Sequence, residues 1–230
     1  MKLCVIPARG GSKRIPKKNI KHFHGKPIIA YSIEAALQSK CFDHVIVSTD
    51  DKAIADISLA YGAEVPFFRP LELANDFAGT LPVIKHAIEF YTKQDIEVDH
   101  VCCIYSTAPF IDAEVLVSSY KQFVKNNVSY CFSVCEFNSP VQRSFIITEE
   151  SRIKMRHPEL FNKRSQDLEP VFYDAGQFYW GTKQAFLDEL PSFGEYTLPY
   201  VLPKTKVQDI DTQEDWILAE IMYQTLMKLD

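Results

Sequence analysis

The stretch Lys2–Asn19 reads KLCVIPARGGSKRIPKKN, and it decides the fold. It opens with a short apolar run that stops just before the glycine pair Gly10 and Gly11. Such a run predicts a buried strand that enters a loop. From Arg9 to Lys26 there are seven basic residues and no acidic one, although the whole chain carries a net charge of −5. A cationic strip on an acidic chain predicts a local anion site.

Beyond this loop, apolar strand-like runs alternate with segments of helical periodicity. Strands are expected at 44–48, 64–68, 100–105 and 129–136, and helices at 27–39, 81–91 and 112–125. Asp50 is expected to cap a further helix that runs to about Tyr61 and ends at Gly62. Repeated β-α units with continuous apolar strands predict an α/β fold with a mainly parallel central sheet flanked by helices. Ligands of such sheets bind at the carboxyl ends of the strands, where the first strand delivers the basic loop.

The segment 140–170 interrupts the alternation. It is polar, with short candidate strands at 145–148 and 153–155, and we interpret it as a small inserted arm, either a lid or part of a dimer interface. A strand at 177–180 and helices at 183–190 and 212–228 are expected after it. A chain of 230 residues without a visible linker predicts a single domain over 1–230.

Composition excludes several classes of protein. Hydrophobic residues make up 47% and charged residues 24%, which is ordinary for a soluble globular protein. The acidic balance favours neither nucleic acid nor a membrane surface, and no apolar run is long enough to span a bilayer. Six cysteines lie mostly in apolar runs without C-x-x-C spacing, which favours buried free thiols over zinc or disulfides. The first apolar run is too short for a signal peptide, so we expect a cytoplasmic protein.

The glycine-bearing loop has the chemistry of a phosphate site. Gly10 and Gly11 allow the backbone to approach a ligand, and successive N–H groups can form an anion-binding nest. Arg9 and Lys13 bring positive charge to the same place. The loop matches neither the Walker A pattern nor the dinucleotide pattern G-x-G-x-x-G. A solvated basic loop that happens to contain glycines stays open as an alternative.

Two late acidic residues predict a metal site. If Val207–Ile210 is extended, Asp209 and Asp211 point to the same side. Converging carboxylates repel each other unless a cation joins them, and Mg²⁺ commonly uses one or two carboxylates together with substrate phosphates. In the alternative interpretation, Asp211 or Thr212 caps the terminal helix and Asp209 is solvated.

A family resemblance is carried by five blocks that occur in order over nearly the whole chain: VIPARGGSKRIPKKN (Val5–Asn19), KNIKHFHGKPIIAYSIEAA (Lys18–Ala36), VIVSTDDKAIADIS (Val45–Ser58), RPLELANDFAGT (Arg69–Thr80) and DIDTQED (Asp209–Asp215). They resemble the acylneuraminate cytidylyltransferase family, the CMP-sialic acid synthetases. YSTAPF (Tyr105–Phe110) and YDAGQFYWGT (Tyr173–Thr182) resemble the branch that acts on pseudaminic acid. Tyr105 stands where the sialic acid branch places a glutamine near the sugar.

The resemblance implies a nucleotide-diphospho-sugar transferase fold, which is Rossmann-like, and a homodimer. It implies transfer of CMP from CTP to the anomeric hydroxyl of an acidic nine-carbon sugar, with release of pyrophosphate and with Mg²⁺ or Mn²⁺ as cofactor. The CMP-sugar would be a donor for glycosylation of glycans or flagellin. Legionaminic acid, N-acetylneuraminate and 3-deoxy-manno-octulosonate are alternative sugars, and a non-catalytic CTP-binding regulator is an alternative of another class.

The resemblance also implies roles for individual residues. The nucleotide would be bound by Ala8, Arg9, Gly10, Gly11, Ser12, Lys13, Lys18, Asn19, Arg69, Asn75, Asp76 and Thr80. The sugar would be bound by Tyr105, Arg164, Gln177 and Tyr179. The metal would be held by Asp209 and Asp211, and the catalytic residues would be Arg9, Lys13 and Asp211.

Overall fold

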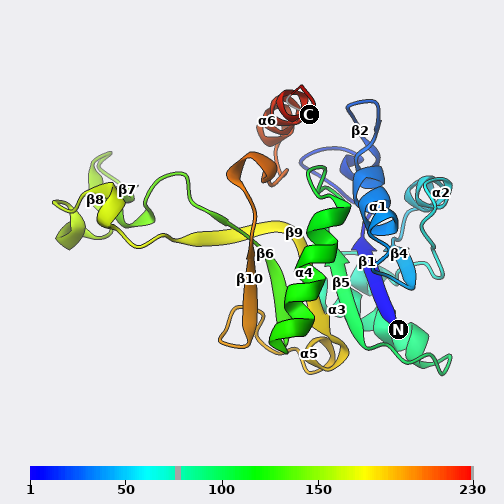
Figure 1. The fold of residues 1–230 in the computed structure, drawn as a ribbon. Helices are drawn as coiled ribbons and strands as arrows, with labels where there is room; N and C mark the ends of the chain where they lie inside the picture. The colour runs from blue at the N-terminus through cyan, green and yellow to red at the C-terminus, as the bar shows by residue number, and fades with distance from the viewer. Residues whose placement is uncertain (76–78, 229–230) are drawn as a thin grey trace.

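A central sheet of six strands organises the chain, in the order β10-β6-β9-β5-β1-β4 (Figure 1). A computed structural model describes residues 1–75 and 79–228. The strands are β1 (Lys2–Pro7), β4 (His44–Ser48), β5 (His100–Ile104), β6 (Tyr130–Glu136), β9 (Phe172–Thr182) and β10 (Thr197–Val201). Strand β9 runs antiparallel between β5 and β6, and the other pairings are parallel. The predicted mainly parallel sheet is therefore confirmed.

Helices cover both faces of the sheet. One face packs against α1 (Ile28–Ser39), α2 (Lys52–Ala60) and α4 (Ala113–Asn126), and the other against α3 (Thr80–Thr92) and α5 (Lys183–Leu187). Alternate residues of β1 enter these two cores, since Cys4 and Ile6 face the first and Leu3 and Val5 the second. All six cysteines are buried and free, as predicted.

The carboxyl ends of β1, β4 and β5 lie at one edge of the sheet. The parallel register pairs Pro7 with Ser48, and the N–H of Ala8 donates to the carbonyl of Ser48 at 2.9 Å. The chain leaves this edge as the basic loop, which contains the short helix η1 (Lys18–Ile20) and the two-residue strands β2 (His22–Phe23) and β3 (Lys26–Pro27). Three loops from neighbouring strands therefore converge at one place.

The last helix, α6 (Gln213–Leu226), packs against the basic loop rather than on the sheet. Trp216 and Ala219 of α6 share an apolar core with Ile15 and Phe23 of the loop. The amine of Lys21 lies 4.1 Å from the centroid of the Trp216 ring. This packing brings residues 209–211, just before α6, to the same edge of the sheet.

The segment between β6 and β9 forms an arm. Its strands β7 (Phe145–Ile147) and β8 (Ile153–Met155) pair as an antiparallel hairpin, which lies far from the sheet (Figure 1). Both strands were predicted from the sequence. Exposed apolar side chains gather on this arm at Phe145, Ile146, Ile147, Ile153 and Phe161. The remaining short helices are η2 (Leu71–Leu73), η3 (Val141–Arg143), η4 (Pro158–Leu160), η5 (Ser165–Asp167) and η6 (Lys204–Lys206).

The structure departs from the expected elements in three places. The segment 64–68 makes only isolated parallel bridges, because Pro66 lacks the N–H that a regular ladder needs. No strand was expected at 197–201, where β10 lies; as the edge strand next to β6, it tolerates Pro199. Asp51, not Asp50, caps α2 by accepting from the N–H groups of Ala53 and Ile54 at 2.7 and 3.1 Å.

The length and hydropathy of each described helix show whether it could cross a membrane. Within residues 1–75 and 79–228, no helix combines the length and the apolar character that crossing a bilayer requires.

Candidate active site

A cavity of about 480 Å³ opens at the carboxyl edge of the sheet. We call it the first cavity. The residues predicted for the site that line it are Arg9, Ser12, Lys13, Lys18, Asn19, Arg69, Thr80, Tyr105 and Asp211. They come from the basic loop, from the segment before η2, from the start of α3, from the segment just after β5 and from the segment before α6. The structure therefore brings distant parts of the sequence together around the first cavity. Most of the charged side chains that line this cavity are cationic.

Buried hydrogen bonds fix the shape of the basic loop. Asn19 is buried; its amide nitrogen donates to the carbonyl of Arg9 at 2.9 Å, and its amide oxygen accepts from the Ser106 hydroxyl at 2.9 Å. The N–H of Gly10 donates to Asp50 at 2.9 Å. A Cβ at Gly10 would lie 2.8 Å from the Asp51 carboxylate, so the close approach of the two loops requires glycine there.

Because Asn19 serves two partners, we expect Asn19→Ala to lower the free energy of unfolding by about 1–3 kcal/mol. The buried hydroxyl of Ser106 and the carbonyl of Arg9 would each lose a hydrogen bond. Urea denaturation measures this change. Asn126→Ala is the matched control, since Asn126 is exposed and donates within its own helix, to the carbonyl of Gln122. Equal destabilisation by the two variants would contradict the role given to Asn19.

Arg69 presents a fixed buried cation to the first cavity. Its Nε donates to the Ser48 hydroxyl at 3.1 Å, and its guanidinium also donates to the Ser48 carbonyl. Burial lowers the pKa of the Arg69 guanidinium below its ordinary value, and the nearby charge of Asp50 opposes this shift. An anionic ligand would restore the favourable interactions that burial removes from this group.

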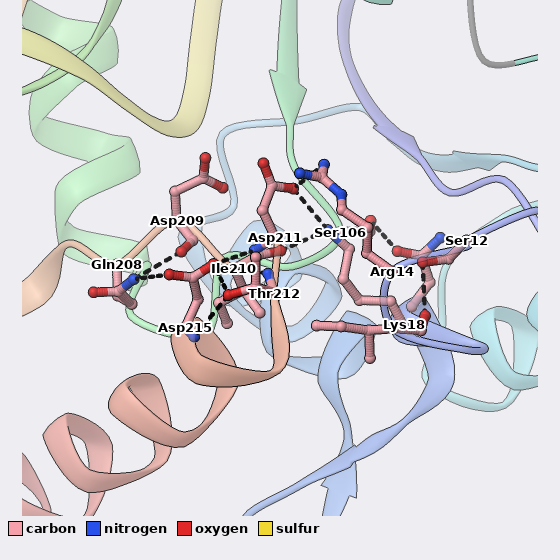
Figure 2. Close-up of polar contacts among 12 residues, drawn as sticks. Ser12, Arg14, Lys18, Ser106, Gln208, Asp209, Ile210, Asp211, Thr212 and Asp215 are labelled. Atoms are coloured by element: carbon pink, nitrogen blue, oxygen red, sulfur yellow. Dashed lines mark hydrogen bonds and ion pairs between the residues drawn. The ribbon is translucent and has the colours of Figure 1, made fainter. Parts of the chain in front are cut away.

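Asp211 faces the basic loop directly (Figure 2). The Arg14 guanidinium lies 2.8 Å from its carboxylate, and the Lys18 amine lies 3.5 Å from it. Lys18 also donates to the carbonyl of Ile210 at 2.6 Å. The cations near the start of the chain and this late acid thus meet at one wall of the first cavity. Arg14 was noted in the basic strip but was not predicted as a site residue.

The start of α6 is capped without either late acid. The Thr212 hydroxyl accepts from the N–H of Asp215, and the Asp215 carboxylate accepts from the N–H of Thr212 at 2.7 Å, which completes a capping box. Of the two caps in the alternative interpretation, Thr212 is confirmed and Asp211 is excluded, and Asp209 is exposed as that interpretation expects. Asp209 and Asp211 project to the same side in Figure 2. Loss of water around its carboxylate, and then the charge of Asp211, raise the pKa of Asp209 above its ordinary value.

A family model described as Cytidylyltransferase matches residues 3–186. The chain belongs to the cytidylyltransferase family. This cytidylyltransferase is 45% identical, over 222 residues, to the pseudaminic acid cytidylyltransferase of Campylobacter jejuni, and the match covers 96% of each chain. It is 36% identical, over 230 residues, to the CMP-N,N'-diacetyllegionaminic acid synthase of Legionella pneumophila, with 95% of this chain and 94% of that one covered.

A solved structure confirms the fold of the cytidylyltransferase. It resembles a CMP:2-keto-3-deoxy-manno-octonic acid synthetase complexed with CTP, with a TM-score of 0.68 and 17% identity. The match covers 99% of each chain. The arrangement of a mostly parallel sheet between helices is therefore shared over the full length.

The carboxylates of the cytidylyltransferase fit a divalent metal that also binds substrate. Asp209 and Asp211 offer oxygen ligands of like charge, which is the donor type that Mg²⁺ prefers. Among the residues that the structure describes, no group of three His, Cys, Asp or Glu side chains could hold an ion. A metal here would thus take its remaining ligands from phosphate and water. Asp211 lines the first cavity, while the described lining residues do not include Asp209.

A second cavity, of about 160 Å³, adjoins the first in the cytidylyltransferase. Thr80 and Tyr105 line both cavities, and Tyr179 lines the second. Its remaining walls are mostly apolar, with Leu81, Ile84, Tyr130, Phe186 and Phe193 among them. Two residues predicted to bind sugar therefore lie together beside the cationic cavity.

Other predicted residues of the cytidylyltransferase lie elsewhere. Gln177 is buried and donates to the carbonyl of Lys206 at 2.6 Å, and the described lining of neither cavity includes it. Arg164 is exposed on the arm and pairs with Asp167 at 2.7 Å. Asn75 is exposed and donates to the carbonyl of Glu72 at 2.8 Å. Asp76 lies outside the described residues. Ala8, Gly10 and Gly11 lie in the same loop as Arg9, but the described lining of the first cavity does not include them.

Proposed function

We propose that this chain transfers CMP from CTP to the anomeric hydroxyl of pseudaminic acid, an acidic nine-carbon sugar, and releases pyrophosphate. The observation that carries the proposal is the first cavity, of about 480 Å³, whose walls bring the loop cations together with Asp211. The identity of 45% to the Campylobacter jejuni enzyme supports the choice of sugar. The more distant Legionella pneumophila relative keeps the legionaminic acid reaction as an alternative.

In this reaction the chain mainly positions and neutralises charge. Arg9, Lys13 and Lys18 hold the phosphates of CTP. The sugar hydroxyl attacks the α-phosphorus and loses its proton to water, while the bond from the α-phosphorus to the bridging oxygen breaks and pyrophosphate leaves. Charge accumulates on phosphate oxygens, so fixed cations stabilise the transition state more than the ground state. A divalent metal on Asp209 and Asp211 supplies further positive charge to the phosphate oxygens. With a metal held by Asp211, the Arg14 guanidinium, which now pairs with that carboxylate, would be available to the phosphates.

The sugar occupies the side of the first cavity that adjoins the second. Thr80 and Tyr105 form the boundary, and the largely apolar second cavity accepts a substituent of the sugar ring. The carboxylate of the sugar is attracted by the cations of the first cavity. Tyr105 and Tyr179 thereby contact the sugar.

The arm completes a homodimer. Its exposed apolar side chains at Ile147, Ile153 and Phe161 are 75%, 70% and 67% accessible, which suits burial against a second copy. Arg164 lies on this arm and outside the described lining of both cavities, so its contact with the sugar stays a prediction. The six buried free thiols suit a reducing cytoplasm.

A pyrophosphate-release assay tests the proposed function. The purified chain is incubated with CTP and, separately, with pseudaminic acid, N,N'-diacetyllegionaminic acid and N-acetylneuraminate. We expect the highest kcat/KM with pseudaminic acid. Tight CTP binding without pyrophosphate release for any of these sugars would favour a CTP-binding regulator instead.

Removal of divalent metal should abolish this activity. We expect EDTA to reduce pyrophosphate release to background, and excess Mg²⁺ or Mn²⁺ to restore it, because phosphate charge is then neutralised again. The same assay measures both steps. Undiminished turnover in EDTA would remove the metal from the mechanism.

A further inference from the structure

Strand β9 carries an irregularity next to the second cavity. Its register with β6 shifts between Phe132 and Val134, and Gly176 adopts a positive φ of 61°. At this point the Asp174 carboxylate turns back on its own strand, and its Oδ1 accepts from the N–H of Gly176 at 2.9 Å. Irregularities of this kind re-aim side chains near functional sites. Here the side chain that is re-aimed is Asp174, which lines the second cavity.

The other oxygen of Asp174 reaches the tyrosine pair. The hydroxyl of Tyr179 donates to Asp174 Oδ2. The ring of Tyr179 contacts that of Tyr105, with centroids 5.4 Å apart and planes inclined at 43°. The hydroxyl of Tyr105 lies 3.4 Å from the hydroxyl of Thr80. A continuous set of contacts therefore runs from Asp174 to the wall that separates the two cavities.

The three residues of this set, Asp174, Tyr179 and Tyr105, are half-buried. Loss of water, followed by the charges of Tyr105 and Asp174, raises the pKa of Tyr179 far above its ordinary value, so its hydroxyl remains a donor. Burial likewise raises the pKa of Tyr105. A hydrogen bond to a carboxylate in such surroundings is stronger than one to a neutral acceptor. The Tyr179 hydroxyl is thus held in one direction.

We propose that Asp174 is a positioning residue for the sugar: through Tyr179 it fixes the orientation of the tyrosine pair that the sugar contacts. This inference rests on the proposed function, because it requires the sugar to lie against Tyr105 and Tyr179. Asp174 acts on the sugar half of the site, while the triphosphate half is held by the basic loop. A change at Asp174 therefore alters recognition of the sugar and leaves recognition of CTP as it was.

Asp174→Asn separates this role from a purely structural one. The amide oxygen of asparagine can still accept from the N–H of Gly176, so the turn is kept. The amide nitrogen then faces Tyr179 as a donor, which reverses the polarity of that contact. If Asp174 served only the turn, Asp174→Asn would behave as the wild type.

The test compares Asp174→Asn, Tyr179→Phe and the double variant in the pyrophosphate assay, with melting temperatures measured alongside. We expect each single variant to raise the KM for pseudaminic acid about tenfold, as for loss of a charge-assisted hydrogen bond. The KM for CTP should stay near the wild-type value, and the melting temperatures check that each variant is folded at the assay temperature. The double variant should match the single ones within about twofold, because the two residues act as a unit.

Asp188→Asn is the matched control, since Asp188 is an exposed acceptor at the end of α5 that bonds to Gln184. It should leave both KM values unchanged. The inference is overturned if Asp174→Asn leaves the KM for the sugar unchanged, if it raises the KM for CTP equally, or if the two effects multiply independently. If the wild-type enzyme turns over pseudaminic acid in the same assay, such a result overturns the role of Asp174 and leaves the proposed function standing. A wild-type enzyme inactive on every acidic sugar tried would end both together.

Discussion

Asp211→Asn is expected to lower kcat by a factor of about 10²–10³ while the fold stays intact. The substitution keeps the size of the side chain and removes the charge that faces Arg14 at 2.8 Å in the first cavity. A metal that neutralises phosphate charge would lose one of its two carboxylates. Initial rates of pyrophosphate release at saturating substrates measure the loss, and circular dichroism checks the fold.

Asp56→Asn is the control for Asp211→Asn. Asp56 also pairs with a cation, Lys52, at 3.1 Å, but on the exposed surface of α2. It should keep the wild-type kcat, since exposed pairs of this kind contribute little to stability. A kcat of Asp211→Asn within about threefold of the wild type would contradict a catalytic role for Asp211, because a lost transition-state contact costs far more.

Arg9→Ala is expected to lower kcat/KM for CTP about 100-fold, because a fixed cation beside developing phosphate charge is lost. Arg9 lines the first cavity, and buried Asn19 donates to its carbonyl, so the backbone that carries the side chain is held beside the cavity. Steady-state kinetics with varied CTP at saturating sugar measures the change.

Lys17→Ala is the matched control for Arg9→Ala, since it removes one positive charge from the same loop. Lys17 is exposed, has a left-handed φ of 52°, and does not belong to the described lining of the first cavity. It should remain within about twofold of the wild type, as expected for a substitution away from the ligand. Equal losses for the two variants would mean that the strip acts through net charge alone.

The sheet could be predicted where apolar runs are local and continuous. The strand Lys2–Pro7 and the hairpin of the arm are read from their own residues and were confirmed. Two prolines lie where the observed strands differ from the expected ones. Pro66 interrupts a segment that was expected to be a strand, and Pro199 lies in one that was not. In both cases the outcome depends on which neighbour each strand edge meets, which is a property of the tertiary fold.

In the candidate site too, local features could be predicted from the sequence and contacts between distant segments could not. The cations of the basic loop are close in sequence, so their convergence was predictable from the residues. The contact between Arg14 and Asp211 was not, because it depends on Trp216 of α6 packing against Phe23 of the loop. The direction of Gln177 is set by the carbonyl of Lys206, and no local pattern reveals that partner.

Crystals of the enzyme grown with Mn²⁺ and a non-hydrolysable CTP analogue test the central claim most directly, namely that the early cations and the late acids enclose one triphosphate and its metal. We expect an anomalous peak for Mn²⁺ against the carboxylates of Asp209 and Asp211, and triphosphate density against Arg9 and Lys13 in the first cavity. Nucleotide density outside that cavity, or Mn²⁺ bound away from both carboxylates, would contradict it.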